Sequence, residues 1–180
     1  MGTRAPPACD AVKLVDPADP QKGFMFDGRL NEDFKLSSGT WVRASMLRMR
    51  LLAHFDGLVQ DAVLAGPDRD YVVALFFPAL ESCRELCPRL SATASIREVL
   101  GHAKVRAVFQ ERLNSFAALN NATSTRIQRA ILLDLPPLIE AREITDKGTL
   151  SYAAVLKNRA AVVEQLYLEP VANDVFTVPR

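Results

Sequence analysis

Histidine and cysteine are scarce in this sequence, with two and three copies among 180 residues. Protein zinc sites draw mainly on these two residue types, in closely spaced groups. Cys83 and Cys87 stand four residues apart in residues 79–87, which read as a short helix ended by Pro88. An odd number of irregularly spaced cysteines is also a poor disulfide framework. We therefore expect two buried thiols in a reducing compartment, and no metal site.

The sequence also lacks a charge excess and a long apolar run. Lys and Arg total 22 against 21 Asp and Glu, which gives no electrostatic reason to expect nucleic acid or an anionic membrane as a partner. The longest apolar run, residues 71–80, contains a proline and is far shorter than the roughly 20 residues of a spanning helix. The N-terminal residues contain no apolar secretion signal. These features favour a cytoplasmic protein without a membrane partner.

A glycine-rich phosphate loop is missing as well, because Ser37-Ser38-Gly39-Thr40 has neither the lysine nor the spacing of a P-loop. We therefore expect no nucleotide to be held tightly by this chain alone. The sequence also gives little support for a free-standing small-molecule enzyme. No Ser-His-Asp, Cys-His or paired-carboxylate spacing suggests an active site of that kind.

What is present is an alternation of strand-like and helix-like segments. Propensity and turn residues predict strands at residues 11–15, 24–26, 58–65, 71–77 and 126–133, and an extended segment at residues 34–42. The strand at residues 71–77 is apolar on both faces, as a central strand should be. Strands interleaved with helices predict an α+β fold, with a small mixed or antiparallel sheet packed against helices and a short N-terminal hairpin.

Helix signals follow the strands. Ser45 is placed to cap a helix whose Leu47, Leu51 and Phe55 recur every four residues. A capping box, Ser95 with Glu98, begins a second helix within residues 91–119, where a shift of the apolar phase predicts a bend or a further helix. The last long helix is predicted over residues 151–167, followed by a polar tail.

Residues 26–42, Phe-Asp-Gly-Arg-Leu-Asn-Glu-Asp-Phe-Lys-Leu-Ser-Ser-Gly-Thr-Trp-Val, resemble the hinge segment of adenylate-forming acyl-CoA synthetases. In that superfamily a large N-terminal domain binds ATP and the acid, and a small C-terminal domain swings about the hinge to close the site. The resemblance implies that residues 1–30 are a remnant of the large domain. Residues 31–180 would form the C-terminal lid domain, with a helical insertion near residues 88–122.

The resemblance assigns nucleotide contacts to Asp10, Arg29 and Lys35. Asp10 matches the position whose carboxylate accepts hydrogen bonds from the ATP ribose, and Arg29 matches a guanidinium that contacts the nucleotide. Cys9 replaces the usual glycine before Asp10, so a solvated loop aspartate is the alternative interpretation. Asn31 falls at the hinge, which must absorb a large change in φ and ψ, and asparagine reaches the left-handed region more readily than most residues.

Residues 34–42 resemble the loop that lines the tunnel for the pantetheine arm of CoA, which implies CoA contacts from Ser38, Gly39 and Trp41. A glycine lets the backbone approach a slender ligand. Trp41 would supply an apolar wall, or else be an ordinary core residue. Together with Glu143-Ile-Thr-Asp-Lys-Gly148, this segment looks most like feruloyl-CoA synthases, which activate ring-substituted cinnamic acids.

In this family a lysine of the small domain contacts the acid carboxylate and the α-phosphate during adenylation. A fixed cation aimed at developing charge is worth roughly 3 to 4 kcal/mol. Alignment puts that lysine on Val155, which carries no charge and lies on the apolar stripe of its helix. We expect Lys147, in a Thr-Asp-Lys-Gly turn, to take the catalytic role, with Lys157 as the alternative. An ordinary turn lysine is the competing interpretation of Lys147.

The resemblance thus implies the C-terminal part of an ATP-dependent acid:CoA ligase. ATP or AMP, CoA and Mg²⁺ held by the large domain would serve the complete enzyme, with an aromatic carboxylic acid as substrate. We expect no activity from this chain without the large domain or a split-gene counterpart. The alternative is a non-catalytic interaction or oligomerisation module that keeps the lid fold and forms, for example, a homodimer.

Overall fold

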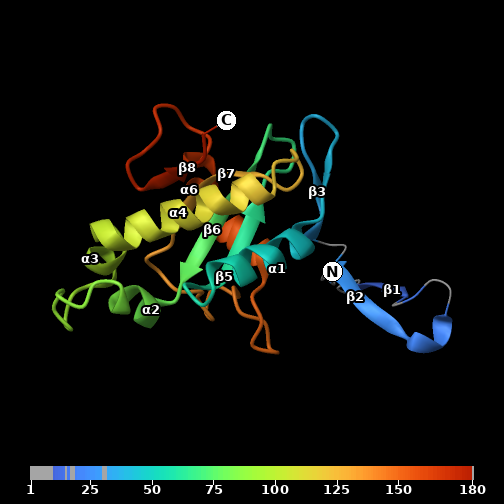
Figure 1. The fold of residues 1–180 in the computed structure, drawn as a ribbon, viewed down its shortest axis with the longest axis horizontal. Helices are drawn as coiled ribbons and strands as arrows, with labels where there is room; N and C mark the ends of the chain where they lie inside the picture. Colours follow the sequence, from blue (N-terminus) through green and yellow to red (C-terminus); the bar gives the residue numbers. More distant parts are fainter. Residues whose placement is uncertain (1–9, 15, 17–18, 30–31, 180) are drawn as a thin grey trace, which may run out of the picture.

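A computed structural model of the chain describes residues 10–14, 16, 19–29 and 32–179. Its centre is a four-stranded sheet in the order β5-β6-β7-β8 (Figure 1). The strands are β5 Val59–Ala65, β6 Val72–Pro78, β7 Ile127–Leu132 and β8 Val175–Thr177. β5 and β6 are antiparallel, β6 and β7 are parallel, and β7 and β8 are antiparallel. The predicted α+β class with a mixed sheet is therefore confirmed.

The parallel pair of β6 and β7 needs a crossover connection, because parallel neighbours cannot be joined by a tight turn. Three helices supply it, namely α2 Leu80–Glu85, α3 Ile96–Gly101 and α4 Ala103–Leu119. The predicted capping box starts α3, since the Ser95 amide donates to Glu98 Oε2 (2.7 Å) and the Glu98 amide donates to Ser95 Oγ (3.3 Å). The phase shift after this helix corresponds to the break between α3 and α4.

Helices cover both faces of the sheet. α1, Ala44–Phe55, and α4 lie across one face (Figure 1). There the Phe55 ring lies 4.8 Å from that of Phe76 and 5.5 Å from that of Phe109, measured between centroids. The other face packs against α5 Tyr152–Asn158 and α6 Ala160–Gln165, whose neighbourhood buries Val155 and Leu166. β6 is buried on both faces because it lies inside the sheet.

The residues near 88–122 are part of this core. α4 buries Val105, Phe109, Leu113 and Phe116 against the α1 side of the sheet. Loss of this segment would expose the apolar face of β5 and β6. The segment predicted to be an insertion is therefore a necessary part of the core.

The start of α1 differs from the prediction. Ser45 is a buried residue of the first helical turn. The residue at the N-cap position is Arg43, whose side chain makes no capping hydrogen bond. Asp33 takes the capping role from eleven residues upstream, with its Oδ1 accepting from the Ala44 amide (3.0 Å). A local pattern could not indicate a cap that folds back from a preceding loop.

The predicted helix over residues 151–167 is also divided. α5 ends at Asn158 and α6 begins at Ala160, with Arg159 between them at φ −107° and ψ 25°. The sequence predicts only a polar tail beyond it, and the structure forms β8 there, paired with β7. Both differences depend on partners that are distant in the sequence.

Two small hairpins precede α1. β1 Asp10–Leu14 pairs antiparallel with β2 Phe24–Arg29, which confirms the predicted N-terminal hairpin. It extends away from the four-stranded sheet (Figure 1). Residues 34–42 are not continuously extended, because β3 Phe34–Lys35 turns back to pair with β4 Trp41–Val42. Within the part of the chain that the structure describes, no helix combines the length and apolar character needed to cross a bilayer.

Candidate functional site

Lys147 lies at the tip of a short hairpin that leads into α5. The Thr145 amide donates to the Thr149 carbonyl (2.8 Å), and the Gly148 amide donates to the Thr145 carbonyl (2.8 Å). Gly148 takes φ +74°, which suits glycine in a tight turn. The Lys147 side chain is exposed, and it forms no hydrogen bond or ion pair with any other described residue. The turn therefore presents an unneutralised ammonium to solvent.

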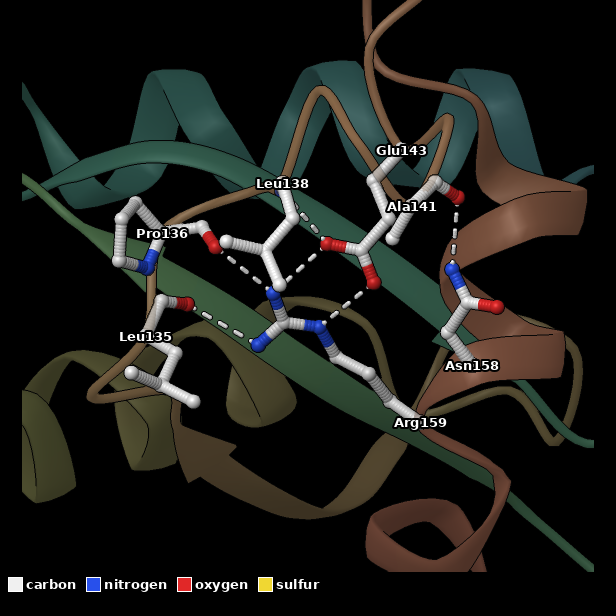
Figure 2. Close-up of polar contacts among 7 residues, drawn as sticks. All are labelled: Leu135, Pro136, Leu138, Ala141, Glu143, Asn158 and Arg159. Atoms are coloured by element: carbon white, nitrogen blue, oxygen red, sulfur yellow. Dashed lines mark hydrogen bonds and ion pairs between the residues drawn. The ribbon is translucent and has the colours of Figure 1, made fainter.

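The base of this hairpin is held by a buried ion pair between Glu143 and Arg159 (Figure 2). Their side chains are 1% and 10% exposed. Arg159 Nε donates to Glu143 Oε1 (3.0 Å) and Nη2 donates to Oε2 (2.8 Å), so the pair is bidentate. The hydrogen bonds from Arg159 hold the pKa of the Glu143 carboxyl below its ordinary value, against the opposing effect of burial. The carboxylate is thus ionised at neutral pH.

The same two side chains also fix the preceding loop. Arg159 Nη1 and Nη2 donate to the carbonyls of Leu135 (3.0 Å) and Pro136 (2.8 Å). Glu143 Oε2 also accepts from the Leu138 amide (2.9 Å). Leu135, Pro136 and Glu143 lie around the guanidinium, whereas Asn158 and Ala141 bond to each other at one side (Figure 2). Few donors or acceptors of the pair are left unused, as a buried ion pair requires.

Val155 and Lys157 occupy opposite environments on α5. Val155 is fully buried with Leu166 and Phe77 in the core behind the sheet, so the position that aligns with the family lysine has a structural role here. Lys157 is exposed in the last turn and, among the described residues, has no hydrogen-bonding or ionic partner. Glu164, in the following helix α6, accepts from Arg69 Nη2 (2.6 Å).

Ser38 and Gly39 lie in the tight turn between β3 and β4, and Trp41 is the first residue of β4. The Gly39 amide donates to the Leu36 carbonyl (2.8 Å), and Gly39 takes φ +80°. A methyl group built on Gly39 would meet nothing within 4 Å, so this face of the turn is open. Trp41 is 60% exposed, which excludes the core interpretation. Lys35 Nζ lies 5.0 Å from the Trp41 ring centroid, within the range of a cation–π contact.

The β3–β4 turn is anchored to the turn between β5 and β6. The Ser37 amide donates to the Arg69 carbonyl (2.9 Å), and Ser37 Oγ donates to Asp70 Oδ1 (2.7 Å). Gly66 allows this approach, because a methyl group there would come within 3.0 Å of the Phe34 ring and of a backbone carbonyl. The open face of the turn is therefore supported from behind by the sheet.

Two cavities lie on different sides of α1. The first, about 350 Å³, is lined by Glu32, Ser45, Arg48, Met49, Asp61, Gly148, Thr149, Leu150 and Tyr152. The second, about 330 Å³, is lined by Trp41, Arg43, Met46, Leu47, Arg50, Ser124 and Thr125. Because a helix turns by 3.6 residues, the α1 residues of the two sets face roughly opposite directions. The structure thus places the Lys147 hairpin and the Trp41 turn beside separate hollows.

Each cavity contains arginine. Arg48 Nε donates to Asp61 Oδ1 (2.7 Å), and its guanidinium carbon lies 5.0 Å from the Tyr152 ring centroid. This arginine is therefore already neutralised and fixed. Arg43 and Arg50 line the second cavity with Trp41, so an aromatic face and two guanidinium groups occur together there. An anionic ligand with a planar ring suits such a surface.

The remaining predicted site residues are the nucleotide contacts Asp10, Arg29 and Lys35 and the hinge residue Asn31. Asp10 and Arg29 are opposite each other in the register of β1 and β2, which brings the two predicted nucleotide contacts to the same end of one hairpin. Asn31, the predicted hinge, lies outside the described residues. Lys35 is in β3, against Trp41, and so is grouped with the predicted CoA residues.

Cys83 and Cys87 are both buried, as predicted. Cys87 Sγ lies 3.3 Å from the Cys83 carbonyl oxygen, and burial raises the pKa of the Cys83 thiol to about 11. Such a thiol is a poor nucleophile near neutral pH. Across residues 10–14, 16, 19–29 and 32–179, no group of three or more His, Cys, Asp or Glu side chains could hold a metal ion.

Several residues of these sites were not singled out from the sequence. In the sequence, Glu143 stands out only as the first residue of the 143–148 segment that resembles feruloyl-CoA synthases. Its partner Arg159 is sixteen residues away, and no helix or strand periodicity links the two positions. Arg48, Arg43 and Arg50 look like ordinary charged positions of a surface helix. The interruption of the apolar stripe after Asn158 is the one local signal that could have drawn attention to Arg159.

Solved structures with a similar fold are adenylation domains. The A-PCP didomain of carboxylic acid reductase from Segniliparus rugosus, in complex with AMP, aligns over 89% of this chain with a TM-score of 0.61 and 24% identity. The A domain of the same reductase, in complex with AMP and a co-purified carboxylic acid, covers 88% at a TM-score of 0.61 and 23% identity. The adenylation domain of the carboxylate reductase from Mycobacterium chelonae covers 88% at a TM-score of 0.60 and 19% identity.

These similarities establish the fold. The chain spans only 20% to 22% of the length of those three structures, so its fold matches a part of each of them. No protein-family model matches the sequence, and neither does any curated protein.

Proposed function

We propose that this chain is the C-terminal lid of an adenylate-forming acid:CoA ligase and works only with a large ATP-binding domain. The observation that carries the proposal is that Gly148 and Thr149 of the lysine hairpin and Trp41, next to the glycine turn, line cavities on different sides of α1. A lid that presents one side for adenylation and another for thioester formation needs such an arrangement. The fold shared with adenylation domains supports the same assignment.

In the adenylation step, we assign the cation to Lys147, with Lys157 as the alternative. The ammonium would contact the acid carboxylate and the α-phosphate and stabilise charge as pyrophosphate leaves. Lys147 is favoured because it stands at the tip of a hairpin whose base is fixed, whereas Lys157 lies along the side of a helix. Asp10 and Arg29 would contact the nucleotide with Lys35, and Asn31 would be the hinge. Mg²⁺, as Mg·ATP, would be held by the large domain.

In the thioester step, we assign CoA contacts to Ser38, Gly39 and Trp41. The open face of Gly39 gives the pantetheine arm a path along the backbone. Lys35 beside the exposed Trp41 ring adds a positive charge at the same turn. The preferred acid is a ring-substituted cinnamic acid, by resemblance to feruloyl-CoA synthases, since the acid pocket belongs to the large domain.

Reconstitution tests this proposal. The chain is mixed with the large domain of a feruloyl-CoA synthase that lacks its own C-terminal domain, together with ATP, ferulic acid and CoA. We expect pyrophosphate release that neither part gives alone. The positive control restores the synthase's own C-terminal domain to the same large domain. Rescue by that domain but not by this chain would contradict the proposal.

Two variants separate the half-reactions. Lys147→Ala is expected to lower acyl-adenylate formation by about a hundredfold to a thousandfold, because a fixed cation is lost from the developing charge. Thioester formation from supplied adenylate should be retained. Gly39→Leu should do the reverse, since a side chain would project into the thiol path. Equal losses in both steps for Lys147→Ala would remove its catalytic role, and the same measurement on Lys157→Ala tests the alternative lysine.

A second candidate function is the non-catalytic interaction or oligomerisation module. Leu135, Leu138 and Ile139 favour it, because these large apolar side chains are exposed on one loop. Stable self-association without rescue of the large domain would support the module over the lid.

A further inference from the structure

Glu143 is the one charged side chain that is fully buried among the described residues of this chain. A buried ion pair contributes little net stability, because the cost of removing two charges from water offsets their attraction. Apolar residues of similar volume would fill the same space at no such cost. The position of Glu143 beside the Lys147 hairpin therefore calls for an explanation other than stability.

The contacts of Glu143 join both strands of that hairpin. Its carbonyl accepts from the Ser151 amide (2.8 Å), and its amide donates to the Leu138 carbonyl (3.0 Å). One residue further on, Ile144 and Leu150 form an antiparallel bridge. Glu143 thus lies where the hairpin meets the body of the protein, and a shift of Glu143 would be carried to the tip.

Arg159 closes this unit from its other end. The hairpin leads directly into α5, and Arg159 follows the last residue of that helix. Its side chain returns to Glu143 through two parallel hydrogen bonds (Figure 2). A bidentate fork fixes orientation as well as distance, unlike a single point-charge contact. Asn158 adds a third link, since its Nδ2 donates to the Ala141 carbonyl (2.9 Å).

We propose that Glu143 and Arg159 are positioning residues that set the orientation of the Lys147 hairpin relative to α5. This inference rests on the proposed catalytic role of Lys147. The ion pair does not touch the reactants; it limits where the ammonium can lie when the lid closes. A displacement of about 1 Å at a reacting group can cost about a hundredfold in rate, so a fixed base for an otherwise exposed lysine has a direct catalytic consequence.

The first test uses hydrogen exchange in the 180-residue chain. Glu143→Gln is compared with Glu164→Gln, which removes an exposed carboxylate that also pairs with an arginine but lies away from the hairpin. We expect Glu143→Gln to speed exchange of the amides of Thr145, Gly148 and Ser151 by about tenfold or more. The amides of β5 and β6 exchange through global unfolding, so they should lose protection only by the factor that the lowered unfolding free energy gives and should remain better protected than the hairpin amides. Glu164→Gln should change neither set.

The second test measures both half-reactions in the reconstituted enzyme. Glu143→Gln should lower acyl-adenylate formation by about a hundredfold while thioester formation from supplied adenylate is kept, and Glu164→Gln should leave both rates unchanged. Arg159→Lys keeps the positive charge but loses the fork, so it should show the same selective loss to a smaller degree. If Glu143→Gln does not fold, Arg159→Lys provides the same test.

Two outcomes would overturn the inference. One is hairpin exchange that stays as slow as in the wild type, or that occurs with the same opening free energy as exchange in the sheet, which would make the pair a general stabiliser. The other is an equal loss in both half-reactions. If Lys147→Ala leaves adenylate formation intact, the proposed catalytic lysine fails instead, and the exchange experiment still decides whether the ion pair orders the hairpin.

Discussion

At the scale of single residues, two charged side chains near the same hairpin have opposite environments. Glu143 is buried and fully paired, whereas Lys147, four residues later, is exposed with no partner among the described residues. Val155, at the position that aligns with the family lysine, is part of the core. A cation at Val155 would be desolvated behind the sheet, so this position cannot supply the ammonium that the proposed function requires.

The buried carboxylate predicts a pH dependence of stability. Because the folded-state pKa of Glu143 lies below its ordinary value of 4.5, its ionised form contributes stability that is present above pH 4.5 and is lost as the pH falls through the folded pKa. Glu143→Gln should reduce the free energy of unfolding at pH 7 by about 3 to 5 kcal/mol, since Arg159 is left buried without its partner. The difference between wild type and variant should shrink on acidification.

Urea unfolding at a series of pH values measures this difference. The expected pattern is two stability curves that converge between pH 7 and the acid end of the range. Parallel curves would mean that the carboxyl has the same pKa in the folded and unfolded chains, and the ion pair would then not be formed in solution.

At the scale of secondary-structure elements, the ends of helices are set by residues outside them. α1 receives its cap from Asp33 in the segment before β3, and α5 stops where Arg159 turns to Glu143. At α1, a carboxylate from an earlier segment accepts from a backbone amide of the first turn. At α5, the residue after the helix pairs with a carboxylate from an earlier segment. The internal residues of these helices nevertheless follow the apolar periodicity of the sequence.

The cap of α1 can be tested by substitution. Asp33→Ala should lower the free energy of unfolding by about 1 kcal/mol, because the Ala44 amide loses its acceptor. Asp33→Asn keeps a side-chain oxygen and should retain most of that stability. Chemical unfolding followed by circular dichroism measures both variants. Equal destabilisation by alanine and asparagine would show that the carboxylate acts through its charge and not as a cap.

At the scale of the whole molecule, the crossover between the two parallel strands contributes to the core on one face of the sheet. α4 spans the α1 face of the sheet (Figure 1). The Phe109 ring packs near the rings of Phe55 in α1 and Phe76 in β6. The lysine hairpin and the glycine turn are attached to this body, one through α5 and the other through the β5–β6 turn. The body therefore fixes the two proposed functional segments relative to each other.

Removal of a core ring should reveal this dependence. Phe109→Ala is expected to cost about 3 to 5 kcal/mol of unfolding free energy, because a large side chain is lost from a closed apolar cluster. Leu119→Ala is the matched control, because Leu119 is the last residue of the same helix and is 76% exposed. It should change the free energy of unfolding by less than about 0.5 kcal/mol. A small loss for Phe109→Ala would mean that α4 is not a necessary part of the core.

Local sequence patterns determined most elements of this protein. The apolar repeat of Leu47, Leu51 and Phe55, the Ser95–Glu98 capping box and the apolar run of β6 each depend on neighbours within a few residues, and the structure confirms them. The Thr-Asp-Lys-Gly turn was also recognisable, because tight turns are encoded by adjacent residues. The glycine turn between β3 and β4 was not, since residues 34–42 were predicted to be extended. Their roles in catalysis remain predictions.

Only the tertiary structure decided which distant groups meet. The parallel pairing of β6 with β7, the addition of β8, the Asp33 cap and the Glu143–Arg159 ion pair all join residues whose separation follows no helix or strand period. Sequence periodicity reports which face of an element is apolar, but it carries no information about which polar partner lies across the space between elements. For this reason the candidate lysine could be found in the sequence, while the buried pair at the base of its hairpin could not.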